Sequence, residues 1–597
     1  MEQKSFSATL KRVFTMDKTI CRAIASWASF AMLNLFGEGD YFQLAYAQET
    51  SIVKMVLIIA IFFGLYSTVS YLVDGYHTDS WFLITAATVC SATWLFDYQD
   101  SSKRFLVTIG IVAVYLLFLF YFVRVNEDVI KKFEPNSKVT LTFAILCGVT
   151  MAAVVSVITC LRYRTFSTPN FDFGLFCNMF YNMKETGLPM ITSERDRLLS
   201  HFAVHISPAF YILLPFYYIF PSPLTLQIGQ AVVLASGVIP VWLLARHFKF
   251  SGKMTMAITA MYALFPALSG GCFYDIHENC FLAPLLLWTF YFFEREKYIP
   301  MYIFAVSVLL VKEDAAIYLL MFALFVLLSR KKYFHGTILA TLSVFYFALA
   351  TYLLVEFGDG VLTNRFGNLI FNQDEGLLGA AKTALFNPGY LVTQLFTTGG
   401  GTGFEKIVYF LQILLPLGFL PFCTKKTSRW ILLAPILISM VTHYSYLYDI
   451  GFQYQFGITA FFIYATMLNI GELKAPTRNT FVTIGIVACV ALWIATVSPK
   501  FTYYTQIWEE NKEEYQHMDQ VLDTIPEDAS VNVSSFLLAH IADRDTVYEV
   551  AYHNNVADVD YVVLDARYSG YESTYTAYKA QGYEVERREA GIIILKK

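Results

Sequence analysis

Charged side chains are scarce in this chain of 597 residues, and their scarcity excludes an ordinary soluble protein. Asp, Glu, Lys and Arg make up 15% of the sequence, against about 25% in average soluble domains, and the mean hydropathy is +0.50. Apolar runs of about 17 to 25 residues follow one another, each long enough to cross about 30 Å of hydrocarbon. The sequence therefore predicts a polytopic α-helical membrane protein. The small net charge of −4 argues against a nucleic-acid partner.

Several familiar site patterns are also missing. The nine cysteines form no CxxC pair and show no zinc spacing. TTGGGTG at 397–403 is followed by FEK instead of Gly-Lys-Ser/Thr, so it is not a phosphate-binding loop and is expected to be flexible linkage. No small-residue cleavage site follows the basic N-terminus, so no cleavable signal is predicted. Cys272 and Cys280 bracket a short polar loop and could form a disulfide if that loop faces an oxidising compartment.

The charges that flank the apolar runs orient them, because Lys and Arg concentrate in short cytoplasmic loops. Basic residues before the first run place the N-terminus in the cytoplasm. Lys131, Lys132 and Lys138 place the loop before 139–161 on the same side, so that run leads outward. Continued along the chain, the rule predicts roughly 13 to 15 spans in the cell membrane and a C-terminus outside the cytoplasm.

Three parts are predicted. Residues 1–132 form an extra N-terminal transmembrane module, and residues 133–498 form the main transmembrane module with long outer loops at 162–222 and 357–406. From 499 to 597 the apolar runs shorten to strand length and alternate with helical patterns. This last part is predicted to be a small extracytoplasmic α/β domain.

Four polar clusters interrupt the apolar sequence, and under the predicted orientation all four face outward. A charged side chain at the membrane centre costs at least about 2.5–3.5 kcal/mol, so such clusters are typical of functional sites. The clusters are Asp172 with His201 and His205; Asp275, His277 and Glu278; Lys312, Glu313 and Asp314; and His443, Tyr444, Tyr446, Asp449, Gln453 and Tyr454. Together they predict one polar cavity that opens to the outside. Each cluster taken alone also fits a helix cap, a solvated loop, a self-neutralising ion pair or an aromatic belt.

The order and spacing of these motifs resemble a known family. The segments that carry the resemblance are FDFGLFCNMFYNM, SHFAVHISPAFYILLPFYYIFPSP, FYDIHENCFLAPLLL, LLVKEDAAIY and IPEDASVNVSSFLLAHIADRDTVYEV. They are similar to the bacterial and archaeal membrane family catalogued as domain of unknown function 2079, from residue 139 to the C-terminus. That family is in turn similar to the GT-C glycosyltransferases, polytopic enzymes that use polyprenyl-phosphate-linked sugars.

The resemblance implies a membrane glycosyltransferase of GT-C type. It would move a sugar, a hexose or pentose, from a polyprenyl-phosphate-linked donor to an extracytoplasmic glycan, lipid or protein. GT-C enzymes carry an active-site acid in the first outer loop, and that position falls on Asp172, the expected base. The groups expected to stabilise the departing phosphate are His201, His277 and Lys312, with Arg365 as a further candidate. The other expected substrate-binding residues are His205, Asp275, Glu278, Glu313, Asp314, His443 and Tyr444.

Three questions stay open at this point. Asp275 and Glu278 could orient a histidine or share a divalent metal, but FDFG has one acid where GT-C motifs often have two, so the need for a metal is undecided. A secondary transporter also needs polar residues around a cavity, although one-sided motifs without paired broken half-helices disfavour it. A non-catalytic envelope assembly protein on the same fold is the third possibility.

Two further expectations concern the outer segments. FYILLPFYYIFPSP is broken by proline, so it is expected to lie along the membrane surface and to guide an isoprenoid tail into the cavity. The C-terminal α/β domain is expected either to hold the acceptor or to cap the cavity.

Overall fold

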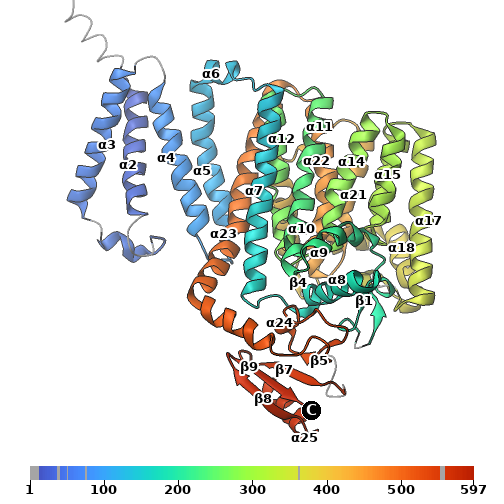
Figure 1. The fold of residues 1–597 in the computed structure, drawn as a ribbon. Coiled ribbons are helices and arrows are strands. Elements are labelled where there is room, and N and C mark those ends of the chain that lie inside the picture. Colours follow the sequence, from blue (N-terminus) through green and yellow to red (C-terminus); the bar gives the residue numbers. More distant parts are fainter. Residues whose placement is uncertain are drawn as a thin grey trace, which may run out of the picture.

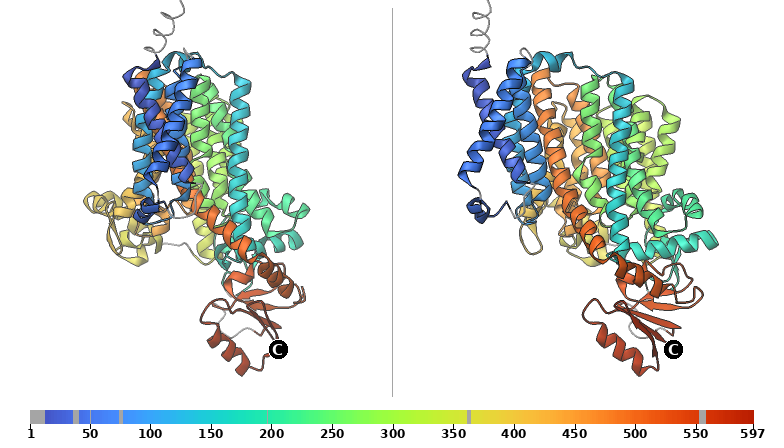
Figure 2. Two further views of the ribbon diagram at one scale, coloured as in Figure 1. Left: turned by 90° about the vertical axis from the view of Figure 1, so that its left-hand side faces the viewer. Right: turned by 60° about the vertical axis from the view of Figure 1, so that its left-hand side comes forward.

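The computed structural model of the chain describes residues 13–35, 41–49, 51–73, 77–195, 197–360, 364–551 and 558–597. Helices that lie side by side form its main body, and a small α/β domain hangs from one end of this bundle (Figures 1 and 2). In the described part, seven helical segments are long and apolar enough to cross a membrane. They are α3 (Ile52–Leu72), α5 (Arg104–Val125), α7 (Ser137–Arg164), α10 with α11 (Pro223–His247), α12 with α13 (Gly252–Cys272), α17 (Tyr333–Phe357) and α23 (Ala475–Leu522). The protein is thus a polytopic helical membrane protein.

Shorter apolar helices complete the bundle beside the seven long segments (Figure 1). They are α14 (Leu282–Glu294), α15 (Tyr298–Leu309), α16 (Ala315–Leu328), α21 (Ala434–Val441) and α22 (Phe456–Ile470). Every residue of α22 is buried by protein, which explains why a helix of 15 residues can be apolar on all sides. The expected 13 to 15 spans counted such short runs together with the long ones.

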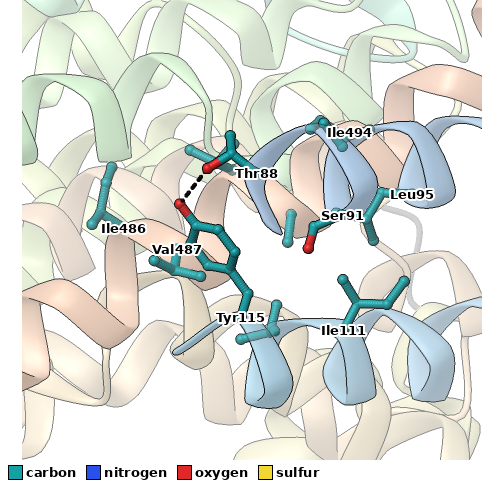
Figure 3. Close-up of a pocket in the computed structure, with 12 residues that line it drawn as sticks. Thr88, Ser91, Leu95, Ile111, Tyr115, Ile486, Val487 and Ile494 are labelled. Carbon is teal, nitrogen blue, oxygen red and sulfur yellow. Dashed lines mark hydrogen bonds between the residues drawn. The ribbon is translucent and has the colours of Figure 1, made fainter. Parts of the chain in front are cut away.

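The N-terminal helices form a separate group at one side of the bundle (Figure 1). The group contains α2 (Met16–Asn34), α3, α4 (Thr78–Asp97) and α5. Where α4 and α5 meet α23, a cavity opens that is lined mainly by apolar side chains such as Leu95, Ile111 and Ile494 (Figure 3). Thr88 and Tyr115 form a hydroxyl pair there, with 3.0 Å between the two oxygens. This module joins the rest of the protein through membrane-embedded contacts.

The C-terminal domain is built on a five-stranded mixed sheet with the order β6-β5-β7-β9-β8. Its elements are β5 (Val531–Val533), α24 (Ser535–Leu538), β6 (Val547–Glu549), β7 (Tyr561–Asp565), α25 (Tyr571–Ala580), β8 (Glu584–Glu589) and β9 (Ile592–Lys596). Strand β5 pairs in parallel with both β6 and β7, whereas β9 pairs antiparallel with β7 and β8. The small α/β domain predicted from the strand-length patterns is therefore confirmed. Helix α23 runs from the bundle to this domain through Pro499.

The connecting helices mark the two ends of the bundle. Helix α6 (Glu127–Lys132), which carries Lys131 and Lys132, lies at the end away from the C-terminal domain, whereas α8 (Leu175–Thr186) and α18 (Gly376–Phe386) lie at the end that carries this domain (Figure 1). The loop with Lys131 and Lys132 thus lies at the end of the bundle opposite to the C-terminal domain. Residues 1–12, which supply part of the N-terminal basic charge, lie outside the described residues. The orientation toward the cytoplasm stays a prediction.

Candidate functional site

Four of the polar segments meet beside α8. They are the turn η2 (Asn170–Gly174), the loop 201–207, the loop between α13 and α14, and the turn between α15 and α16. Each segment is irregular and connects helices, so its backbone can turn charged side chains toward the others. Hydrogen bonds and ion pairs link all four segments into one buried polar network, which brings together Asp172, His277 and Lys312.

Asp172 and His277 form the most accessible pair of the network. His277 Nε2 lies 2.7 Å from Asp172 Oδ2, and its Nδ1 lies 3.3 Å from the main-chain oxygen of Asp275. Because a carboxylate and a carbonyl only accept hydrogen bonds, the ring carries a proton on both nitrogens when both bonds form. The His277 side chain is 5% exposed, whereas that of Asp172 is 31% exposed. Asp172 thus keeps one carboxylate oxygen, Oδ1, free of this bond.

The charges of this pair stabilise each other. Burial disfavours the ionised form of Asp172, but the charge and the hydrogen bond of His277 outweigh it, so the pKa of Asp172 is lowered. Burial likewise disfavours the charged imidazole, but Asp172 outweighs it and the pKa of His277 is raised. The two residues therefore favour each other's charged forms, and the pair favours the ionised carboxylate of Asp172.

Glu278 and Lys312 form a second pair, which is almost fully enclosed. Lys312 Nζ lies 2.6 Å from Glu278 Oε1, and both side chains are less than 5% exposed. Burial opposes both charges, but the attraction between them outweighs it: the pKa of Glu278 is lowered and that of Lys312 is raised. Lys312 therefore stays cationic, although Glu278 neutralises most of its charge.

Two histidine–carboxylate pairs lie on the 201–207 loop. His205 Nδ1 lies 2.8 Å from Glu313 Oε1, and His201 Nδ1 lies 3.1 Å from Glu194 Oε2. Burial and the charge of Lys312 lower the pKa of His205, because together they outweigh its bond to Glu313. Burial also opposes the charge of His201, but Glu194 outweighs it and the pKa of His201 is raised. His201 Nε2 is buried and has no hydrogen-bond partner among the described residues.

Asp275 has a structural environment that the sequence did not predict. Both of its carboxylate oxygens lie 3.2 Å from Arg162 Nε, and Gln227 Nε2 donates to Oδ1 at 2.7 Å. Its φ of 89° is unusual for a residue with a side chain, and these contacts hold it in that conformation. The carboxylate of Asp275 thus faces Arg162, while its carbonyl oxygen faces His277. In this way Asp275 orients the histidine through its main chain.

The part of the chain that the structure describes contains no set of ligands for the divalent metal considered above. There, no three His, Cys, Asp or Glu side chains are grouped as they would be around an ion. Asp275 and Glu278, the two acids considered for a shared metal, are each bound to a cation instead. The carboxylate of Glu278 meets Lys312, and that of Asp275 meets Arg162.

Arg365 lies beside a small cavity next to the network. Asn279, Asp314 and Tyr454 are among the residues that line this cavity of about 80 Å³. The Arg365 guanidinium lies over the rings of Tyr444 and Tyr454, 5.6 and 5.4 Å from their centroids. In the described ranges no carboxylate lies within ion-pair distance of it. Arg365 is therefore a partly exposed cation whose N–H groups are available to an anion.

His443 is the predicted site residue that lies apart from the network. It lines a second cavity of about 500 Å³ with Glu405, Tyr448 and the hairpin of β3 (Thr397–Thr398) and β4 (Gly401–Thr402). The expectation that TTGGGTG is flexible linkage is therefore wrong. Thr397 pairs with Thr402, and the two glycines between the strands allow a tight turn.

The two cysteines considered for a disulfide are both free thiols and both buried. Cys272 ends α13, where its thiol donates to the main-chain oxygen of Leu268. Both thiols therefore behave as small buried hydrophobic groups.

Sequence reasoning missed Arg162 and Gln227 as site residues, and it did not predict that Glu194 pairs with His201. Two signals point to the first two. Arg162 ends a span predicted to lead outward, where the charge rule disfavours a basic residue. Gln227 lies in an apolar span, where a polar side chain needs a partner. No local signal links Glu194 to His201, because the loop between them sets that contact.

Fold and site together define a multi-pass helical membrane protein with a buried ionic network near its α/β domain. A family model described as a predicted membrane protein (DUF2079) matches residues 162–594, and the chain belongs to this family. The resemblance stated from the motifs is thereby confirmed. No curated protein matches. One similar solved structure is the crystal structure of ArnT from Cupriavidus metallidurans bound to undecaprenyl phosphate, at 12% identity and a TM-score of 0.47, covering 76% of this chain and 97% of that chain.

Proposed function

We propose that this protein is a membrane glycosyltransferase that moves a sugar from a polyprenyl-phosphate-linked donor to an extracytoplasmic acceptor. The observation that carries the proposal is the Asp172 carboxylate, which has a lowered pKa, is partly exposed and is paired with His277 at one end of a membrane bundle. The resemblance of the motifs to GT-C enzymes supports the reaction class. The acceptor would be a glycan, lipid or protein of the cell envelope.

The proposed reaction is a substitution at the anomeric carbon of the sugar. The acceptor hydroxyl oxygen forms a bond to this carbon while the bond from the carbon to the donor phosphate oxygen breaks. The electron pair of the broken bond leaves with the polyprenyl phosphate, and the hydroxyl proton passes to Asp172. The ring of His277 lies at Oδ2 of Asp172 and orients this oxygen, which leaves Oδ1 for the acceptor.

Cations near the phosphate of the donor stabilise the negative charge that develops on this phosphate as it departs. Arg365 is the best placed for direct contact, because it is partly exposed, lines a cavity and has no carboxylate partner in the described residues. Lys312 is enclosed and paired with Glu278, so it acts through its electrostatic field. His201 and His205 are paired with Glu194 and Glu313, and these pairs fix the 201–207 loop.

The test is transfer of radiolabelled sugar from a panel of polyprenyl-phosphate donors by purified protein in lipid. Asp172→Asn removes the base but keeps the shape of the side chain, and a lost general base lowers rates by about 10²–10⁴-fold. Asp374→Asn is the control, since Asp374 is an exposed acid of the outer loop, outside the network. Thermal unfolding checks that each variant is folded.

The outcomes separate the alternatives. Transfer by wild type and by the Asp374→Asn variant, with loss in the Asp172→Asn variant, supports the proposal. Equal turnover in all three removes Asp172 from the chemistry. If no donor is used, the non-catalytic function gains support, and solute uptake into proteoliposomes then tests the transporter.

A further inference from the structure

The C-terminal domain meets the loop of Asp172 at a particular edge of its sheet. Strands β5, β6 and β7 are mutually parallel, and Glu549 is the last residue of β6. In open α/β sheets, the carboxyl ends of parallel strands are where ligands bind. Here a segment of the membrane module, residues 170–192, lies against the ends of β5 and β6 and along edge strand β6.

Asn170, two residues before Asp172, makes the central contact. Its side-chain Nδ2 donates to Glu549 Oε2 at 2.7 Å and to the main-chain oxygen of Ser193 at 3.2 Å. Its main-chain N–H donates to Ser535 Oγ, 3.1 Å away, just after β5. Asn170 is fully buried and Glu549 is 4% exposed. A hydrogen bond from an amide to a buried carboxylate is among the stronger neutral–charged contacts.

Contacts on the far side of Asp172 fix the same segment. Asn178 Nδ2 donates to the main-chain oxygens of Ala542 and Arg544 at 3.0 and 2.9 Å. Thr192 donates its hydroxyl proton to the carbonyl of Val547 and accepts from the N–H of the same residue. The segment is thus tied to the C-terminal domain both before and after Asp172.

We infer that Asn170 is a positioning residue for Asp172, and that Glu549 anchors it from the C-terminal domain. This inference rests on the proposed function. Residues 170–174 form an irregular turn, so their own backbone does not fix where the Asp172 carboxylate points. The bond between Asn170 and Glu549 sets the turn, and the turn keeps Asp172 within reach of His277. The C-terminal domain thereby controls the geometry of the site through this bond.

Paired variants separate the hydrogen bond from general damage. Asn170→Asp removes both amide donors and places a second carboxylate against Glu549. Glu549→Gln alone keeps an acceptor oxygen for Asn170 and is the matched control. The double variant Asn170→Asp with Glu549→Gln restores the bond with donor and acceptor exchanged. If Asn170→Asp does not fold, Glu549→Ala removes the same bond from the other side.

Two readouts are needed, one of them independent of chemistry. Hydrogen–deuterium exchange of the peptide 166–176 in lipid nanodiscs reports the turn, and the peptide 561–565 of β7 reports the integrity of the domain. We expect Asn170→Asp to speed exchange in 166–176 by about tenfold with β7 unchanged, because a hydrogen bond to a charged group is lost. We also expect kcat for sugar transfer to fall by about tenfold with KM unchanged, since the substrate contacts remain. The double variant should restore both.

Each unexpected result contradicts a different part of the inference. Unchanged exchange in the Asn170→Asp variant overturns the anchoring, whether or not the protein transfers sugar. Faster exchange with an unchanged kcat overturns the positioning of Asp172, because the turn then moves without consequence. If wild type transfers no sugar, the proposed function and the catalytic sense of the positioning fall together. The exchange pattern in that case still decides whether Glu549 anchors the turn.

Discussion

The ion pair of Glu278 and Lys312 gives a sharp test of the buried network. The Nζ–Oε1 distance is 2.6 Å, and the two side chains are 2% and 4% exposed. Lys312→Met keeps most of the length and volume of the side chain but removes the charge. Glu278 is then an uncompensated carboxylate in a nearly closed site, and breaking a buried pair in this way costs about 3–5 kcal/mol.

Removal of both charges should cost much less than removal of one. Lys312→Met combined with Glu278→Gln leaves no unpaired charge, and neutral replacements of buried pairs are often close to neutral in stability or even stabilising. The two substitutions should therefore be strongly non-additive, with a coupling free energy of about 3 kcal/mol. The single substitution is the more destabilising one because the site is buried, so the charge that remains has neither a partner nor solvent.

Thermal unfolding in lipid nanodiscs measures this difference. At about 2 °C per kcal/mol for a large domain, Tm should fall by about 6–10 °C in the Lys312→Met variant and return to within about 3 °C of wild type in the double variant. Lys332→Met is the control, because Lys332 pairs with Glu296 at 2.8 Å with both side chains about half exposed. Equal losses in the Lys312→Met and double variants, or a loss no larger than for Lys332→Met, would refute the reasoning.

Three further predictions follow from single features. The pKa of His277 is raised in the folded protein, so its pair with Asp172 contributes its full stability below about pH 6.5. This contribution is lost as the pH rises through the pKa of His277 in the folded protein. The difference in Tm between wild type and His277→Gln should therefore be widest near pH 6 and should shrink at higher pH. Gly485→Ala should lower Tm, since its Cβ would lie 2.7 Å from a backbone nitrogen of the neighbouring turn, whereas Gly64→Ala, with nothing within 4 Å, should leave Tm unchanged or raise it. A membrane-impermeant maleimide should label Ser573→Cys in intact cells and Lys131→Cys only after permeabilisation; the opposite pattern would reverse the orientation.

Hydropathy predicted the class of fold because lipid and protein interiors both select apolar side chains. For the same reason it could not separate the two environments. Helix α22 is enclosed by protein along its whole length, whereas Ser70 is the one buried residue of α3. Both read as apolar runs in the sequence. The C-terminal domain was easier to predict, because its short strands and acidic surface differ from everything before it.

Residue type predicted most members of the site but not their partners. The Lys312 of VKED suggested a local pair with Glu313 or Asp314, whereas its bond goes to Glu278, 34 residues away. Asp172 and His277 are 105 residues apart. Such pairings depend on which connecting turns the helices bring together, and no periodicity in a single sequence encodes that.

The exposed fractions of the carboxylates suggest that the enclosed pairs and Asp172 have different functions. Among the described carboxylates that pair with a cation or histidine there, Glu194, Asp275, Glu278 and Glu313 have side chains between 0% and 12% exposed. Asp172 is 31% exposed. Enclosed pairs gain little net stability over apolar packing, because desolvation offsets their attraction. Their function is therefore better sought in the electrostatic environment that they provide around Asp172, whose pKa is lowered and whose side chain stays accessible. If this electrostatic environment serves catalysis, removal of an enclosed partner should change the pKa of Asp172 more than it changes the exposure of the Asp172 side chain.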